Sequence, residues 1–411
     1  MANLRVNQDR LWKSLMDMAR IGSTEKGGVC RLALTELDRE SRDLFGAWCR
    51  DAGCGVTVDQ FGNIFARRPG RDDTLAPVMT GSHLDSQPTG GKFDGAYGVL
   101  AGLEVLRTLN DADYQTEAPI EVVVWTNEEG SRFSPPMIGS GVFAGLFDLD
   151  YARGRVDADG RSQGEALEAI GYAGEAAVGG RAVSAYFEAH IEQGPILEAE
   201  DKVIGAVTGA QGQRWYSVAV SGEEAHAGTT PMPRRKDALL GAARLVAEVN
   251  KIALAHAPHA CGTVGVLRSS PNSRNVIPGS VELTVDLRHP DDRELSVLDG
   301  ELRRGVQAIA DEVGLEIDIE QDYDTAAVPF DDVCIEAVRT AANDCGYTHR
   351  DIISGAGHDA VNISRVAPTG MIFIPCEDGV SHNERENARS DHIAAGCNVL
   401  LDAMVRMADR R

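Results

Sequence analysis

The segment from Ala76 to Leu106 constrains the fold most, because its residue pattern changes twice, from an apolar run to a loop and then to apolar residues at helical spacing. A short apolar run, Ala76–Thr80, leads into His83, and a loop broken by glycine and proline then carries the chain to Asp94. After Asp94 the apolar residues recur at helical spacing, at positions 99, 100, 103, 105 and 106. The segment therefore predicts a strand, a loop and a helix, which is the building unit of α/β proteins.

The loop between His83 and Asp94 is a candidate ligand site. Loops at the carboxyl ends of strands are where α/β sheets usually bind their ligands. An imidazole nitrogen and a carboxylate also suit Zn²⁺ or Mn²⁺. Taken alone, the segment is equally compatible with a glycine-rich turn that contains His and Asp but binds no metal.

The composition is that of an ordinary globular protein. The 411 residues are 43% hydrophobic and 25% charged, and a chain of this length forms two or three domains with a sizeable core. No apolar run approaches the ~18 residues that span a bilayer, and residues 1–10 lack the apolar centre of a signal peptide. We therefore expect a cytoplasmic protein whose eight scattered cysteines are reduced. The formal charge of −23 argues against nucleic acid or an anionic membrane as a partner.

Periodicity predicts two domains, one inserted into the other. Residues 212–330 are expected to follow the order β-α-β-β-α-β of a ferredoxin-like α+β unit. Residues 1–211 and 331–411 are expected to form a larger α/β domain with a mixed sheet flanked by helices. The predicted helices are 8–22, 29–52, 162–171, 235–255, 291–313, 331–345 and 391–408. The predicted strands outside the first hairpin are 76–80, 120–125, 184–190, 214–220, 261–267, 280–287, 315–323 and 372–375.

Three of the predicted strands in the larger domain end in residue types that bind metals. These are His83, the pair Glu128-Glu129 and His190, with Asp94 on the first loop and His382 after the run at 372–375. No local signature such as HExxH gathers these residues. They can meet only if their strands are neighbours in one sheet, as an open α/β sheet allows.

The adjacent carboxylates Glu128 and Glu129 are the most informative pair. At the end of an apolar strand they would repel each other and be costly to bury unless a metal or a proton compensates them. Successive residues of an extended chain point to opposite sides, so one can bind metal while the other takes a proton from metal-activated water. The alternative is a solvated acidic turn.

Several motifs together resemble a known family. They are Gly81-Ser-His-Leu-Asp85, Gly90-Gly-Lys-Phe-Asp-Gly95, Asn127-Glu-Glu-Gly-Ser-Arg-Phe133, His190-Ile-Glu-Gln-Gly194, Asn275-Val-Ile-Pro-Gly279, Asp286-Leu-Arg288 and Ser381-His-Asn383. In this order they resemble the hydantoinase/carbamoylase-type amidases of the M20 metallopeptidase superfamily. That group includes N-carbamoyl-L-amino-acid hydrolases, β-ureidopropionases and allantoate amidohydrolases.

The resemblance implies a site for two divalent metal ions. One ion would be held by His83 and His190, the other by Glu129 and His382, and Asp94 would bridge them. Zn²⁺ is the first choice, and Mn²⁺, Co²⁺ and Ni²⁺ are compatible with the same ligand types. Peptidase members of the superfamily commonly have a carboxylate where this chain has His190, so the histidine favours the amidase branch.

The resemblance also implies the residues that act on the substrate. Glu128 would be the general base, and the substrate contacts would come from Gln193, His226, Asn275, Arg288 and the backbone of Gly357. The Arg288 guanidinium suits a clamp on a carboxylate. His226 is a candidate catalytic donor to the developing oxyanion, acting after closure of an inserted lid or dimerisation domain or from the second subunit of a homodimer.

Some of these residues keep an alternative interpretation. Arg288 can simply pair with Asp286 or Glu282 on a strand surface, and His226 can be an ordinary surface histidine. The role of His358, which follows Gly357, stays open.

We therefore expect a dimetal amidohydrolase that cleaves small N-carbamoyl-L-amino acids to the amino acid, CO₂ and ammonia. Allantoate amidohydrolase and β-ureidopropionase are the alternative activities, and an M20 aminoacylase or peptidase is a weaker one. A non-catalytic binding protein is the alternative from another class, and it would need the metal ligands but not Glu128.

Overall fold

A computed structural model of the chain describes residues 4–410. The chain divides into two compact units, which we call unit 1 (Met1–Thr208 with Phe330–Arg411) and unit 2 (Gly209–Pro329). The division falls after residues 208 and 329, whereas the sequence placed it after 211 and 330.

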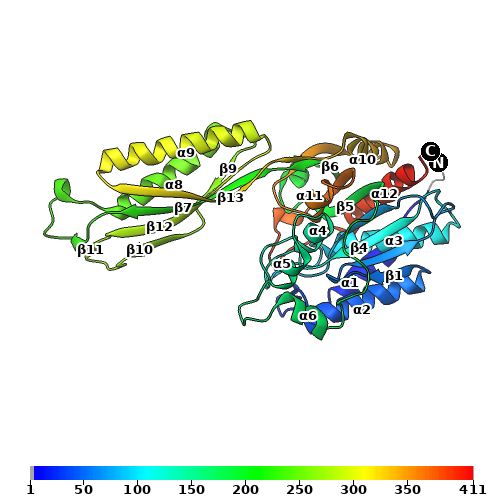
Figure 1. Ribbon diagram of the computed structural model, residues 1–411. Coiled ribbons are helices and arrows are strands. Elements are labelled where there is room, and N and C mark those ends of the chain that lie inside the picture. Colours follow the sequence, from blue (N-terminus) through cyan, green and yellow to red (C-terminus); the bar gives the residue numbers. More distant parts are fainter. Residues whose placement is uncertain (1–3, 411) are drawn as a thin grey trace. The chain divides into compact units, whose positions relative to one another are not determined.

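Unit 1 is built on a mixed sheet, in agreement with the expected fold class (Figure 1). Within the described residues the sheet has nine strands in the order β1-β2-β4-β3-β5-β16-β6-β14, with β15 beside β6; β14 and the last two residues of β6 fall within the range of unit 2. The four central strands β4, β3, β5 and β16 are parallel to one another, whereas β2 and β6 run antiparallel to their central neighbours. The strands are β1 Gly55–Val58, β2 Ile64–Arg68, β3 Val78–His83, β4 Ile120–Trp125, β5 Ala185–Ile191, β6 Ile204–Ala210, β14 Val328–Pro329, β15 His349–Ser354 and β16 Thr369–Ile374.

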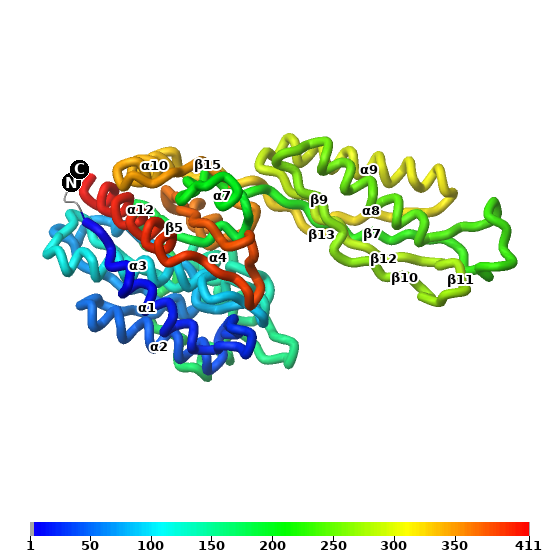
Figure 2. The backbone as a smooth tube through the Cα atoms, turned by 180° about the vertical axis from the view of Figure 1, so that it is seen from behind, coloured from blue at the N-terminus to red at the C-terminus, as the bar shows by residue number. Residues whose placement is uncertain are grey.

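The central strands are buried because helices cover them on both faces. Alternate residues of β5 divide between the faces: Phe187 and Ala189 join the core formed with α3 and α12, whereas Glu188 and His190 face α11. Helices α1, α3 and α12 pack against one another and run side by side in Figure 2. The helices of unit 1 are α1 Gln8–Met18, α2 Glu36–Asp51, α3 Ala96–Asp111, α4 Ile138–Phe143, α5 Leu149–Arg153, α6 Gln163–Ala169, α7 Ile196–Ala199, α10 Asp332–Asp344, α11 Asp359–Ile363, α12 Ser390–Ala408 and the 3₁₀ turn η2 Glu377–Gly379.

The helix expected at 29–52 begins later than the apolar pattern indicated. Helix α2 starts at Glu36, where the side chain of Thr35 caps it by accepting a hydrogen bond from the Asp38 backbone N–H at 3.3 Å. Leu34 precedes the cap in a left-handed conformation, with φ of 58°. A leucine in that conformation interrupts a helix, so the leucines before residue 35 pack as a loop.

Unit 2 has the split βαβ order that the sequence predicted. Its described residues form a five-stranded antiparallel sheet in the order β10-β12-β7-β13, with β9 beside β12, and α8 and α9 pack into its core. The single strand expected at 261–267 is instead two short strands that both pair with β12. The elements are β7 Gly212–Ser221, β8 Ala225–His226, η1 Met232–Arg234, α8 Ala238–Ala255, β9 Cys261–Thr263, β10 Leu267–Ser270, β11 Val276–Ile277, β12 Ser280–His289, α9 Asp292–Val313 and β13 Glu316–Thr325.

All eight cysteines lie within the described residues, and each carries a free thiol. No helix between residues 4 and 410 combines the length and apolar character needed to cross a membrane.

Candidate metal centre and active site

The parallel strands bring the predicted ligands to one edge of the sheet. In the strand register, His83 at the end of β3 lies opposite Trp125 at the end of β4, and His190 of β5 lies opposite Phe373 of β16. The loops that follow β4 and β16 carry Glu128, Glu129 and His382 to the same edge. These residues meet because β4, β3, β5 and β16 are neighbours in one sheet, as expected for an open α/β sheet.

The donor atoms form two clusters that share Asp94. One cluster contains His83, Asp94 and His190, and the other contains Asp94, Glu129 and His382. Asp94 Oδ1 lies 3.2 Å from His190 Nε2 and 3.6 Å from His83 Nε2. Asp94 Oδ2 lies 3.3 Å from His382 Nε2, and Glu129 Oε2 lies 3.5 Å from the same nitrogen. The two oxygens of one carboxylate thus face two different sets of donors.

These distances fit metal ligation. Ligand atoms around a tetrahedral Zn²⁺ with bonds of about 2.0–2.1 Å lie about 3.3–3.4 Å apart. The four histidine–carboxylate separations given above run from 3.2 to 3.6 Å, and all donor atoms of a cluster lie within 4.8 Å of one another. The side chains of Asp94 and Glu129 are only 6% and 4% exposed. Buried carboxylates this close together are costly unless cations compensate them. The donor set therefore suits two divalent cations.

The two strand-borne histidines are oriented by their own backbone. His83 Nδ1 donates to the Asp85 carbonyl at 2.8 Å, and His190 Nδ1 donates to the Ile191 carbonyl at 2.9 Å. Because a carbonyl can only accept, each neutral ring carries its proton on Nδ1 and turns the lone pair of Nε2 toward Asp94.

Glu128 and Glu129, in the bend that follows β4, point to different partners. Glu128 Oε2 lies 3.5 Å from His83 Nε2, whereas Glu129 faces His382 in the second cluster and accepts hydrogen bonds from the backbone and side chain of Gln87 at 3.1 and 2.7 Å. Asn127, with φ of 57°, turns the chain immediately before the pair. The Glu129 carboxylate therefore lies in the cluster with Asp94 and His382, whereas the Glu128 carboxylate lies beside His83 and in neither cluster.

Burial sets the ionisation of these groups in the metal-free protein. Burial raises the pKa of Glu128 well above its usual range, and the neighbouring charges of Asp359 and Glu129 act in the same direction. Burial and the charge of Asp94 raise the pKa of Glu129 to about 7. A hydrogen bond to Asp94 raises the pKa of His382 to about 9. A bound cation lowers the pKa of each carboxylate, because it stabilises the charged form.

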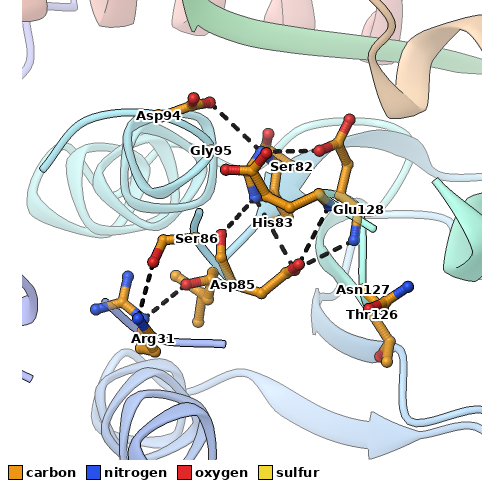
Figure 3. A network of polar contacts seen from close by, with 12 residues as sticks. Arg31, Ser82, His83, Asp85, Ser86, Asp94, Gly95, Thr126, Asn127 and Glu128 are labelled. Atoms are coloured by element: carbon orange, nitrogen blue, oxygen red, sulfur yellow. Dashed lines mark hydrogen bonds and ion pairs between the residues drawn. The ribbon is translucent and has the colours of Figure 1, made fainter. Parts of the chain in front are cut away.

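Asp85 links the ligand loop to the two glutamates, a role that its sequence position did not predict (Figure 3). Its carboxylate accepts the backbone N–H groups of Glu128 and Glu129, each at 3.2 Å, while its carbonyl holds His83. Behind it, the buried Arg31 donates to the Leu84 carbonyl at 2.6 Å. The available signal was the position of Asp85 two residues after His83, but nothing in the sequence shows that its carboxylate faces residues 128 and 129.

His358 and Glu188 lie against His190 on the α11 face of the sheet. The ring centroids of His358 and His190 are 4.5 Å apart, and His358 Nε2 lies 3.0 Å from Ser354 Oγ. Glu188 accepts hydrogen bonds from Ser82 Oγ at 2.7 Å and from a backbone N–H at 2.9 Å. Glu188, His190 and His358 form a third group with ligand geometry, but the contacts of Glu188 and His358 also explain their positions as packing around His190.

Two of the predicted substrate residues lie in unit 1. Gln193, with φ of 57°, donates from Nε2 to Asp94 Oδ2 at 3.0 Å and to Ser381 Oγ at 3.2 Å, so it contacts the shared carboxylate directly. At Gly357, a Cβ atom would lie 2.9 Å from the Met137 methyl group. A side chain at position 357 would therefore displace Met137.

The other three predicted substrate residues lie in unit 2. His226 and Asn275 are neighbours, because β8 pairs with β11 and the Ala227 N–H donates to the Asn275 carbonyl at 2.9 Å. His226 Nδ1 accepts the backbone N–H groups of Gly228 and Thr229 at 3.0 and 3.2 Å. A neutral His226 therefore carries its proton on Nε2.

Arg288 pairs with Asp286, which is one of the alternatives that the sequence left open. The two residues lie two positions apart on β12 and so on the same face of the strand. Arg288 Nη2 donates to Asp286 Oδ2 at 2.8 Å, and Nε donates to Oδ1 at 3.1 Å. This pairing fixes the orientation of the guanidinium group on the strand.

Comparison with known proteins decides the family. Residues 79–406 match the model of peptidase family M20/M25/M40. The chain belongs to this family. M20 amidohydrolases generally depend on two metal ions, which agrees with the two donor clusters around Asp94.

The relatives of this M20 protein narrow the resemblance to the amidase branch. An N-carbamoyl-L-amino-acid amidohydrolase of Rhizobium meliloti is 49% identical over 407 residues, which cover 99% of this chain and 98% of the relative. An allantoate amidohydrolase of Bacillus subtilis is 33% identical over 393 residues, 95% of each chain. The crystal structure of an amidase of the hydantoinase/carbamoylase family from Burkholderia multivorans is 61% identical, covers 99% of both chains and superposes with a TM-score of 0.97. The resemblance inferred from the motifs is thereby confirmed.

Proposed function

We propose that this M20 protein is a dimetal amidohydrolase that removes the carbamoyl group of N-carbamoyl-L-amino acids. The carboxylate of Asp94, shared between two clusters of metal donors, is the observation that carries the proposal. The name of the Rhizobium meliloti relative, 49% identical over nearly the whole chain, supports the substrate class. His83 and His190 would hold one ion and Glu129 and His382 the other.

Two bound dications would lower the pKa of a water molecule and polarise the ureido carbonyl. Glu128 takes the proton of that water, because its carboxylate lies beside His83 and outside both donor clusters. Water oxygen adds to the ureido carbon, the bond from this carbon to the amino-acid nitrogen breaks, and Glu128 returns the proton to that nitrogen. The other fragment, carbamic acid, separates into CO₂ and ammonia.

The substrate is held by groups that match its chemistry. Arg288 clamps the substrate carboxylate with the bidentate geometry of a guanidinium group. Gln193 and Asn275 supply amide hydrogen bonds, and Gly357 contributes backbone contacts. His226 donates from Nε2 to the oxygen that becomes negative during the attack, and this role agrees with the hydrogen bonds that its Nδ1 accepts.

We also propose that Zn²⁺ is the native metal and that the protein works as a cytoplasmic homodimer. Light scattering would then give twice the 44.0 kDa of the chain. A species of 44.0 kDa alone would contradict the dimer.

The test of the activity is ammonia release from purified protein loaded with Zn²⁺, Mn²⁺ or Co²⁺. The substrates are a series of N-carbamoyl-L-amino acids, their D-enantiomers, N-carbamoyl-β-alanine and allantoate. We expect the highest kcat/KM with an N-carbamoyl-L-amino acid. Faster turnover of allantoate would favour the activity named for the Bacillus subtilis relative. No ammonia from any of these compounds would contradict the amidohydrolase proposal.

A further inference from the structure

We propose that Glu386 is a positioning residue for the cluster of Asp94, Glu129 and His382. It holds the loop that carries His382 in place relative to the loop that carries Asp94. The proposal rests on the dimetal centre described above and assigns a role to a carboxylate that belongs to neither cluster. Glu386 follows His382 by four residues, and its side chain contacts the loop that carries Asp94.

The two carboxylate oxygens of Glu386 join the two ligand loops. Oε1 accepts the backbone N–H groups of Phe93 and Asp94 at 3.0 and 3.1 Å. Oε2 accepts the hydroxyl of Ser381 at 2.9 Å. One side chain therefore binds the backbone of the shared ligand Asp94 and the residue immediately before the ligand His382.

The sequence around the first loop is adapted to this contact. Glu386 is 3% exposed, so its oxygens lie among protein donors rather than in bulk water. A Cβ atom at Gly91 would lie 2.0 Å from Glu386 Oε1. Any residue other than glycine at position 91 would therefore push Glu386 away from the loop. The contact with Glu386 thus requires glycine at position 91 for steric reasons.

His382 needs this support more than the other histidine ligands do. Its side chain is 53% exposed, whereas those of His83 and His190 are each 2% exposed and lie on strands. His382 also has φ of 51°, a left-handed conformation that is strained for a non-glycine residue and persists only where surrounding contacts impose it. The link from Ser381 to Glu386 is such a contact.

Loss of the Glu386 carboxylate should therefore affect the two ions unequally. His83 and His190 keep their strands and the carbonyls that orient them. The cluster of Asp94, Glu129 and His382 loses the bridge from the backbone of Phe93 and Asp94 to Ser381. Ser381 Oγ and Gln193 Nε2 still contact Asp94 Oδ2, at 3.3 and 3.0 Å. Removing an outer group of this kind typically lowers metal affinity about 10- to 100-fold, and we expect this loss for one ion only.

The experiment compares Glu386→Ala, Glu386→Gln and wild-type protein by metal analysis after equilibration in buffers of fixed free Zn²⁺. Wild type should hold two ions per chain and Glu386→Ala one, with a melting curve that remains cooperative. Glu386→Gln should hold two, because its amide oxygen can accept from Phe93 and Asp94 while its NH₂ group reaches Ser381. Glu384→Gln, a change in the same loop outside these contacts, is the matched control and should hold two.

Equal affinities of Glu386→Ala and wild type for both ions would contradict the role of Glu386, and so would parallel loss of both ions. Ser381→Ala provides a second route if Glu386→Ala does not fold. It should weaken the second ion selectively, and wild-type affinity for both ions would overturn the proposal. A wild-type protein with fewer than two ions would instead contradict the dimetal centre itself, independently of any substrate.

Discussion

Units 1 and 2 both carry predicted site residues, but the two units differ in how far these residues are buried and in which groups orient their side chains. In unit 1 the histidines His83 and His190 are buried on parallel strands, and backbone carbonyls orient their rings. In unit 2, His226 and Asn275 are exposed; His226 lies in the short β8–β11 pairing, and Asn275 immediately precedes β11. The Arg288 side chain is 31% exposed and pairs with Asp286.

This difference separates two parts of the proposed reaction. The proposed donors for both metal ions all lie in unit 1, so we expect metal binding to depend on unit 1 and to be insensitive to changes in unit 2. Substrate recognition should depend on both units. Substitutions in the two units should therefore give different combinations of metal content, kcat and KM.

Metal removal should have the largest effect. We expect a chelator to abolish ammonia release and added Zn²⁺, Mn²⁺ or Co²⁺ to restore it. The melting temperature should also fall, because a ligand at about 1,000 times its Kd adds about 4 kcal/mol to the free energy of unfolding. Full activity after removal of all metal, checked by elemental analysis, would contradict the proposed chemistry.

Glu128→Gln should lower kcat by about 10²- to 10⁴-fold, because the amide cannot take the proton from water. The variant should still bind two ions, since Glu128 lies outside both donor clusters. Steady-state kinetics and metal analysis check the two parts, with the exposed Glu175→Gln as a control. Loss of an ion together with activity would make Glu128 a ligand rather than a base.

Arg288→Lys should raise KM and leave metal content unchanged. Lysine keeps the charge but loses the planar fork, and hydrogen bonds to charged groups contribute about 1.5–3 kcal/mol. We expect kcat/KM to fall about 10-fold or more. Arg268→Lys on the neighbouring strand β10 is the matched control. Unchanged kcat/KM in Arg288→Lys would leave Arg288 as only the partner of Asp286.

The smallest effect concerns the proton of His226. Its hydrogen bonds predict that the neutral ring is protonated on Nε2. Nitrogen-15 NMR of histidine-labelled protein distinguishes the two tautomers, and the signals lost in His226→Asn assign the ring. Protonation on Nδ1 would exclude donation from Nε2 in the neutral form.

The candidate donors other than Asp94 could be proposed from the sequence because they lie at or after the ends of strands of recognisable composition. The run Ile120–Trp125 is the clearest example, since its β-branched residues form a fully buried strand that ends just before Glu128. The positioning groups were not predictable in this way. Asp85 and Glu386 act by accepting backbone N–H groups from distant segments, and backbone donors leave no residue pattern.

Local conformation accounts for the remaining differences. The left-handed conformation of Leu34 delays the start of α2 although the apolar spacing continues before it. The strand expected at 261–267 is interrupted between Thr263 and Leu267, and both parts still pair with β12. Apolar periodicity reports which residues are buried, but it does not report where the backbone hydrogen bonds of an element begin or stop.

Anomalous X-ray scattering from crystals of the Zn²⁺-loaded protein, recorded above and below the metal edge, would locate the ions themselves. We expect two ions per chain within bonding distance of Asp94, one also bound by His83 and His190 and the other by Glu129 and His382. A single ion would contradict this expectation, and so would an ion bound instead by Glu188, His190 and His358.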